Sequence, residues 1–429
     1  MFSSPARSRH LPCWSIGFAF LLILSSCTLA PPEKDHDIPH ITPTPGVSSG
    51  VSLRPFVDTW NNIHPFLTFD YQISDPATIA KYYDFVWGAS INHVAAFRSG
   101  NPNIFVTYYI PFHIDWGTFS DQHATHDLTY WKKVHPDWIL YQCDRTTPAY
   151  HDAIVPLDFA NPAVVSWEVE TYAKPASQAG YDGIAVDNLV LGNRYHACGV
   201  FVNGKWVRLY TGQLNDPQWR ANIVLWLARM QQALHSLQHP LALIPNIAID
   251  VLSPADPQMQ QLINHVDGLV DEGGFTSYGR GAYLTGNKWW QRVQFMGSLQ
   301  KQHKPYFLID LFPSVGPTEI QWALASYLMG KGHTGGLFIS TPEGYGRDAR
   351  YTEYNAQIGI PLGAMYQSQG VYFRNFSDGL SIVNSSATSS YTVTLNLVLG
   401  HFYTDLYGNT VGQTVTLAPH SGLVLLSTS

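Results

Sequence analysis

The sequence contains little charge. Asp, Glu, Lys and Arg make up 13% of its 429 residues, about half of the share usual in soluble domains, and the net charge is −7. This excludes the basic surface that nucleic-acid binding requires. No Cys/His set has zinc-ligand spacing, no Gly-x-Ser-x-Gly elbow is present, and no Gly-rich phosphate loop follows a strand. These absences argue against a zinc centre, an α/β-type serine hydrolase and a dinucleotide-binding protein. We therefore expect no metal and no cofactor.

Long apolar runs are missing as well. The longest, at 14–24, is too short to span a bilayer comfortably, and Arg7 and Arg9 precede it. The sequence Leu-Ser-Ser-Cys that ends at Cys27 resembles the bacterial lipoprotein signal, in which the cysteine is lipidated. We expect a signal peptide over 1–27 and an extracytoplasmic protein anchored to the membrane by lipid on Cys27. The alternative is an ordinary secretory signal cut nearby.

Cysteine is scarce, and only four residues are present. Cys13 leaves with the signal peptide and Cys27 carries the lipid. Cys143 and Cys198 remain as a pair in an oxidising compartment, which predicts a disulfide. Residues 28–52, rich in Pro, Ser and Thr, are typical of a flexible linker.

Aromatic residues are abundant, at 14% with 13 Trp and 24 Tyr. With so little charge, this composition suits a neutral, polyhydroxylated ligand on which flat rings can stack. Most of these rings are expected simply to fill a large core.

Apolar runs alternate with helical patterns over 53–365, which is typical of a parallel β/α fold. Helix starts are marked by Asn161-Pro162 and Asp216-Pro217, and Pro175 is expected to end or kink the first of these helices. We predict a (β/α)8 TIM barrel, with an open doubly wound sheet as the alternative. Over 366–429 short alternating runs between turns predict a small antiparallel β-sandwich. The eight barrel strands are expected at 66–71, 83–88, 104–110, 183–188, 242–247, 268–272, 306–311 and 336–341.

Five of these strands carry a polar residue near the end. Because side chains alternate along a strand, we expect all five residues on the inner face, at one mouth of the barrel. Burying so many carboxylates together is costly unless they are paired, hydrogen-bonded or functional. The five residues are Asp70, Asp187, Asn246, Glu272 and Asp310.

Two carboxylates that face one site are the minimum equipment for cleaving a glycosidic bond. One protonates the leaving oxygen, and the other attacks the sugar or activates water. Crowding separates their pKa values, so that one acid stays protonated near neutral pH. A metal-dependent hydrolase is an alternative, with Asp70, Asp187 and Asp310 around a hard cation. A carbohydrate-binding lipoprotein without activity is another.

The segment Gly180-Tyr-Asp-Gly-Ile-Ala-Val-Asp-Asn188 resembles the strand-four motif of the hypothetical bacterial glycoside-hydrolase TIM-barrel families, which carry a small C-terminal β domain. The stretches 157–162 and 270–275 are similar to their segments before strand four and at strand six. The resemblance implies a glycoside hydrolase and no particular substrate. We expect the enzyme to act on a poly- or oligosaccharide.

By that resemblance Asp187 is the nucleophile and Glu272 the acid/base of a retaining mechanism. Alternatively, Asp187 is the acid and Asp310 the nucleophile. Asp271, the other acid of strand six, is expected to face the helices in a salt bridge or cap. The remaining inner polar residues, together with Asn188, are candidates to bind substrate. Further candidates for sugar contact are Trp87, Tyr109, His113, Trp116, Tyr278 and Tyr345.

Overall fold

The computed structural model describes residues 52–59, 63–115, 126–149, 154–247, 255–276, 283–396 and 402–428. The predicted signal peptide, the lipidation site Cys27 and nearly all of the predicted linker lie outside these residues. Among the helices in the described ranges, none has the length and apolarity needed to cross a membrane.

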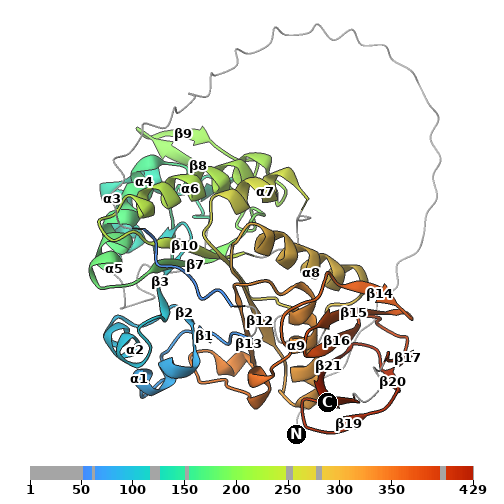
Figure 1. Cartoon of the computed structure of the whole chain (residues 1–429). Helices are drawn as coiled ribbons and strands as arrows, with labels where there is room; N and C mark the ends of the chain where they lie inside the picture. Colours follow the sequence, from blue (N-terminus) through green and yellow to red (C-terminus); the bar gives the residue numbers. More distant parts are fainter. Residues whose placement is uncertain are drawn as a thin grey trace, which may run out of the picture. The chain divides into compact units, whose positions relative to one another are not determined.

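Eight parallel strands of the described chain form one sheet in sequence order (Figure 1). The first and last strands meet through a parallel bridge between Pro65 and Leu337, whose N–H donates to the His64 carbonyl at 2.9 Å. The sheet therefore closes into a barrel, and the predicted (β/α)8 fold is confirmed. Its strands are β1 (Leu67–Thr68), β2 (Phe85–Trp87), β3 (Phe105–Pro111), β7 (Gly183–Leu189), β10 (Ala242–Ile247), β11 (Leu269–Asp271), β12 (Tyr306–Leu311) and β13 (Gly336–Ser340).

Side-chain alternation divides the barrel strands between two cores. One parity fills the barrel interior, which is unusually rich in phenylalanine: Phe66, Phe85, Phe105, Phe307 and Phe338. The other parity, Leu, Ile and Val for the most part, packs against the surrounding helices. Both faces of each strand are therefore apolar, as expected for a parallel sheet buried on both sides.

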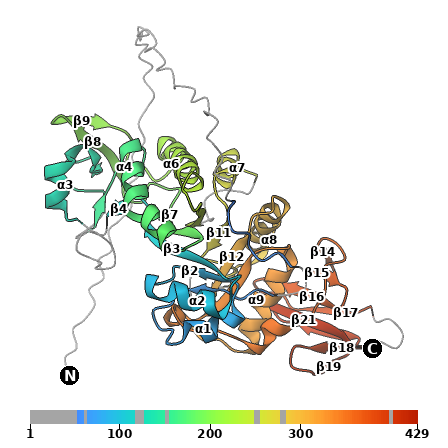
Figure 2. The same cartoon turned by 60° about the vertical axis from the view of Figure 1, so that its left-hand side comes forward.

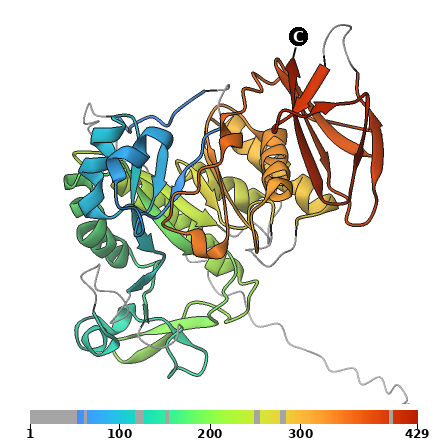
Figure 3. The same ribbon diagram turned by 90° about the horizontal axis from the view of Figure 1, so that it is seen from below.

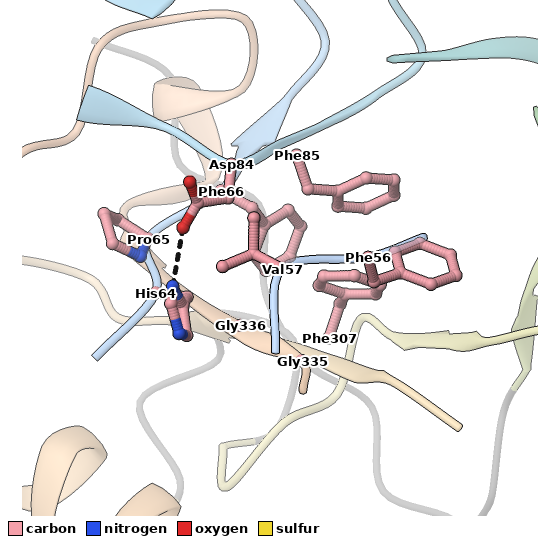
Figure 4. A pocket seen from close by; sticks show the side chains of 10 residues that line it. All are labelled: Phe56, Val57, His64, Pro65, Phe66, Asp84, Phe85, Phe307, Gly335 and Gly336. Carbon is pink, nitrogen blue, oxygen red and sulfur yellow. Dashed lines mark hydrogen bonds and ion pairs between the residues drawn. The ribbon is translucent and has the colours of Figure 1, made fainter. Parts of the chain in front are cut away.

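The end of the barrel where the strands begin is plugged by Phe56, which stacks on Phe105 with ring centroids 4.2 Å apart. Figure 4 shows Phe56 together with Phe85 and Phe307, which line the same hollow. His64 Nδ1 lies 2.6 Å from Asp84 Oδ2 beside the plug. The centre of a water molecule can occupy only about 10 Å³ of the hollow beside this plug. The hollow therefore holds about one water molecule and is far too small for a sugar.

The helices begin where their capping signals lie. The Asn161 side chain accepts from Ala163 N at 3.0 Å, and that of Asp216 accepts from Trp219 N at 3.0 Å. Pro175 does not end its helix, because a π-helical turn at Val169–Ala173 lets the chain continue into the next α-helical segment. The helices are α1 (Pro76–Ile79), α2 (Val94–Gly100), α3 (Leu128–Val134), α4 (Pro162–Glu168), α5 (Lys174–Gln178), α6 (Pro217–His235), α7 (Pro257–Asn264), α8 (Gly286–Lys301) and α9 (Pro317–Gly330).

The connections after β3 and β7 are enlarged into a small substructure with its own aromatic core around Trp131 and Trp138. It contains α3, β4 (Ile114–Asp115), β5 (Tyr141–Gln142), β6 (Val155–Pro156), β8 (Ala197–Val202) and β9 (Lys205–Arg208). Cys143 and Cys198 form a disulfide in it, with Cα atoms 5.0 Å apart. Gly212 packs against both sulfurs, where a β-carbon would lie under 3 Å from each.

The C-terminal residues form antiparallel sheets on the opposite side of the barrel from β8 and β9 (Figures 2 and 3). A six-stranded sheet has the order β14-β15-β16-β21-β18-β19, and β17 pairs with β20 in a second sheet. Val393 and Leu417 of the second sheet pack against the first. The predicted antiparallel domain is thus present. Its strands are β14 (Tyr366–Ser368), β15 (Val371–Phe376), β16 (Gly379–Asn384), β17 (Tyr391–Thr394), β18 (Phe402–Asp405), β19 (Thr410–Val411), β20 (Thr414–Leu417) and β21 (Ser421–Thr428).

The larger sheet is fixed to α9 by specific polar contacts. Arg374 Nη1 donates to the Leu328 and Lys331 carbonyls at 2.7 and 2.8 Å, which satisfies the C-terminal end of the helix. Ser381 Oγ donates to the Ala325 carbonyl at 3.0 Å. At Gly422 the backbone approaches the helix so closely that a β-carbon would come within 2.6 Å of a helix carbonyl.

Candidate active site

Asp187 lies near the C-terminal end of β7, on the inward parity of that strand. Tyr109 Oη, from β3, donates to its Oδ2 at 2.6 Å. The Asn188 backbone N–H donates to Oδ1 at 2.7 Å, and Asn188 Nδ2 donates to Oδ2 at 3.1 Å. Asn188 has φ 60°, a left-handed conformation that asparagine tolerates better than most residues. These donors hold both oxygens of Asp187 in place and stabilise negative charge on them.

Glu272 follows the last residue of β11 and is half-buried. Tyr345 Oη, from the segment after β13, donates to Glu272 Oε1 at 2.6 Å. Burial raises the pKa of Glu272, and the charge of Asp187 raises it further, while the bonds from Tyr345 and Asn246 partly offset the rise. Glu272 therefore keeps its proton to a higher pH than an ordinary glutamic acid does.

Asn246, on β10 between the two acidic strands, connects the pair. Its Nδ2 donates to Asp187 Oδ1 at 3.0 Å and to Glu272 Oε2 at 3.0 Å. Because both oxygens contact one nitrogen, they are at most twice that distance apart. Two carboxyl groups, one of them with a raised pKa, thus face one position at the mouth of the barrel, an arrangement suited to acid/base and nucleophilic chemistry on a glycosidic bond.

Residues 98–380 match the sequence profile of hypothetical glycosyl hydrolase family 15. The chain belongs to this family. The resemblance seen in the strand-four and strand-six segments is thereby confirmed, and the chain is a glycoside hydrolase. A search of the curated proteins finds no match.

Several solved glycoside hydrolase structures are similar to this family member in fold. A maltogenic alpha-amylase from Thermotoga neapolitana shares 11% identity with a TM-score of 0.46, covering 86% of this chain and 99% of that one. An alpha-galactosidase of glycoside hydrolase family 36 from Geobacillus stearothermophilus shares 9% identity with a TM-score of 0.40, covering 86% and 56%. A family 5 glycoside hydrolase from Bacteroides vulgatus shares 9% identity with a TM-score of 0.41, covering 86% and 89%.

Asp310 does not reach the mouth of the barrel. Phe307, Ile309 and Leu311 of β12 fill the interior, so Asp310 has the opposite parity and faces the helix layer with Leu308. It is fully buried, and Phe275 N donates to its Oδ1 at 2.5 Å. Burial raises the pKa of Asp310 to about 7. The predicted inward orientation was wrong, and the alternative with Asp310 as nucleophile is excluded.

Asp70 is also absent from the carboxylate pair. Phe69 has φ 62°, which breaks the alternation of β1 and turns Asp70 toward the chain after β2. There the Ser90 backbone N–H contacts both carboxylate oxygens at 3.0 and 2.9 Å, and His93 Nδ1 lies 2.9 Å from Oδ2. Asp70 anchors this connection, contrary to the prediction of an inward-facing residue.

Trp87, predicted to contact sugar, lies inside the barrel, but it is only 2% exposed and offers almost no surface to a ligand. Its Nε1 donates to the Ile244 carbonyl at 3.3 Å. Among the further sugar-contact candidates, His113 is buried, whereas Trp116 and Tyr278 lie outside the described residues. Tyr109 and Tyr345 therefore remain as the half-buried aromatic candidates beside the acids.

Asp271 faces the helices, as predicted, and forms an ion pair with Arg292 and a hydrogen bond with Tyr306 Oη. A shared cation site is not supported by the positions of Asp70, Asp187 and Asp310. In the part of the chain that the structure describes, no group of three or more His, Cys, Asp or Glu side chains is arranged to hold a metal ion.

Phe69 is the residue at the mouth that sequence reasoning missed. Its ring centroid is 5.1 Å from that of Tyr109 and 6.0 Å from that of Tyr345, the two tyrosines that hold the acids. Its inward position depends on its positive φ, and no pattern in the sequence predicts that backbone conformation.

Proposed function

We propose that this member of hypothetical glycosyl hydrolase family 15 hydrolyses a glycosidic bond in a poly- or oligosaccharide with retention of configuration, using Asp187 as nucleophile and Glu272 as acid/base. The observation that carries the proposal is the single nitrogen of Asn246 shared by the two carboxylates. Because each bond is 3.0 Å long, Asp187 Oδ1 and Glu272 Oε2 are at most twice that distance apart. This is closer than the separation of roughly 6.5–9.5 Å between the two carboxyl groups of inverting enzymes.

In the proposed reaction Asp187 begins as the attacking carboxylate and Glu272 begins as the protonated acid. Asp187 attacks the anomeric carbon while the Glu272 proton passes to the glycosidic oxygen, so the C–O bond breaks and the alcohol leaves. Glu272, now a carboxylate, takes a proton from water. That water attacks the same carbon, the ester to Asp187 breaks, and Glu272 is protonated again. Tyr109 and Asn246 hold Asp187 in position for the first step.

The decisive experiment is turnover by the purified protein on a panel of oligosaccharides, with the anomer of the first product followed by NMR. We expect a product with the configuration of the substrate and no effect of a chelator. The opposite anomer would overturn retention. Loss of activity with the chelator would favour a metal-dependent hydrolase, and binding without turnover would favour a carbohydrate-binding protein.

We also propose that the chain is exported and anchored by lipid on Cys27, with 28–52 as the linker and 1–27 removed. The basic start, the apolar run at 14–24 and the disulfide, a bond typical of oxidising compartments, support this. Cys27→Ala should move the protein from the membrane fraction to the soluble extracytoplasmic fraction. An unchanged membrane fraction would contradict the anchor.

A further inference from the structure

Tyr71 is a large aromatic residue that is 60% exposed at the barrel mouth. Its ring centroid lies 5.8 Å from that of Phe69, whose ring in turn contacts Tyr345, the partner of Glu272. Tyr71 is therefore the outermost member of a row of rings that starts at the proposed acid.

One face of the Tyr71 ring is covered by backbone. A β-carbon built on Gly346 would lie 2.6, 2.7 and 2.8 Å from three adjacent atoms of the ring, so the glycine packs flat against it. The exposed part of Tyr71 is then chiefly the opposite face of the ring. Glycine is also needed at this position because its φ is +73°.

The two segments that form this contact are joined to each other. Gly346 N donates to the Thr68 carbonyl at 2.7 Å, and Gln72 N donates to the Gly346 carbonyl at 3.0 Å. Arg347 Nε donates to Gln72 Oε1 at 2.6 Å. Tyr71 is thus held in place before any ligand arrives, which lowers the entropic cost of binding against it.

We propose that the exposed face of Tyr71 is the platform on which the leaving-group sugar of the substrate stacks. The inference rests on the proposed function of the carboxylate pair. The leaving group lies on the side of the acid that protonates it, and Tyr71 packs on Gly346, the residue next to Tyr345, whose hydroxyl binds Glu272. A flat ring with one face supported and the other in water matches the apolar face of a pyranose.

The test compares two substrates of the same glycone for wild type and Tyr71→Ala: a disaccharide, and the glycosyl fluoride, which has no leaving-group sugar. The probes are the α and β fluorides of glucose, galactose and mannose with matching disaccharides. We expect Tyr71→Ala to lower kcat/KM on the disaccharide about tenfold, mainly through KM, and to leave the fluoride unchanged. Tyr71→Trp, which keeps a flat face, should retain activity on both.

Tyr366→Ala is the matched control, because Tyr366 is 46% exposed but lies in β14 of the C-terminal sheet. It should change neither substrate. An unchanged disaccharide kcat/KM in Tyr71→Ala, or an equal loss on the fluoride, would overturn the platform while leaving the carboxylate mechanism intact. If wild type turned over none of the fluorides or disaccharides, the proposed function would fail, and the platform with it.

Discussion

Asp187→Asn should reduce kcat by about 10⁴-fold or more, because the amide cannot act as the nucleophile. The replacement also presents an N–H group where Tyr109, Asn188 and Asn246 all donate hydrogen bonds. The measurement is steady-state hydrolysis of the best substrate from the panel, with thermal unfolding to verify that the variant is folded.

Glu343→Gln is the matched control for Asp187→Asn. Glu343 is an exposed acid in the turn after β13, so its replacement should leave kcat unchanged. With Asp187→Ala, azide should restore turnover and yield a glycosyl azide of inverted configuration, because azide attacks directly from the vacated side. A folded Asp187→Asn protein with wild-type kcat would exclude the nucleophilic role.

Glu272→Gln should slow the cleavage of sugar leaving groups by about 10²–10⁴-fold, the usual contribution of a general acid. Glycosides with a dinitrophenol leaving group need no protonation, so the first chemical step on them should be nearly unaffected. Pre-steady-state release of the phenol measures that step, and the slow second step should appear as a burst. An equal loss on both leaving groups would contradict the acid role.

The pH profile gives a second measure of Glu272. Burial and Asp187 raise its pKa, so the protonated, active form persists to higher pH than an ordinary glutamic acid allows. Activity on oligosaccharides should fall as the pH rises through this elevated pKa. In Glu272→Gln this alkaline limb should disappear from the residual activity on the same oligosaccharides. Its persistence in the variant would assign the limb to another group.

The barrel strands were predictable because each is a short apolar run between turn signals. The pair Asp187 and Glu272 was also predictable, since Gly183 and Ala185 on one strand and Gly268 on the other indicate the parity of small residues that faces inward. The prediction that Asp310 faces inward failed because both parities of its strand are apolar. In such a strand, alternation alone does not tell which parity faces inward.

The other failures have local causes in the backbone. Asp70 lies away from the mouth because Phe69 adopts a positive φ. Of the two outcomes expected at Pro175, an end or a kink, the end of the helix does not occur, because a π-helical turn precedes the proline. Neither conformation leaves a mark in residue type or spacing. The bridging role of Asn246 likewise depends on the lateral spacing of β7, β10 and β11, which becomes known only once the sheet is assembled.

Helix α9 has consequences for how this chain can be divided. Every residue from Ile320 to Met329 is buried, with the barrel on one side and β16 and β21 on the other. A helix that is apolar all round is stable only when it is enclosed. The change of sequence period near residue 366 is therefore no place to cut the chain. A barrel truncated at that position would expose the apolar face of α9 that β16 and β21 cover, and it would aggregate. The C-terminal sheet is therefore part of the structure that encloses the barrel.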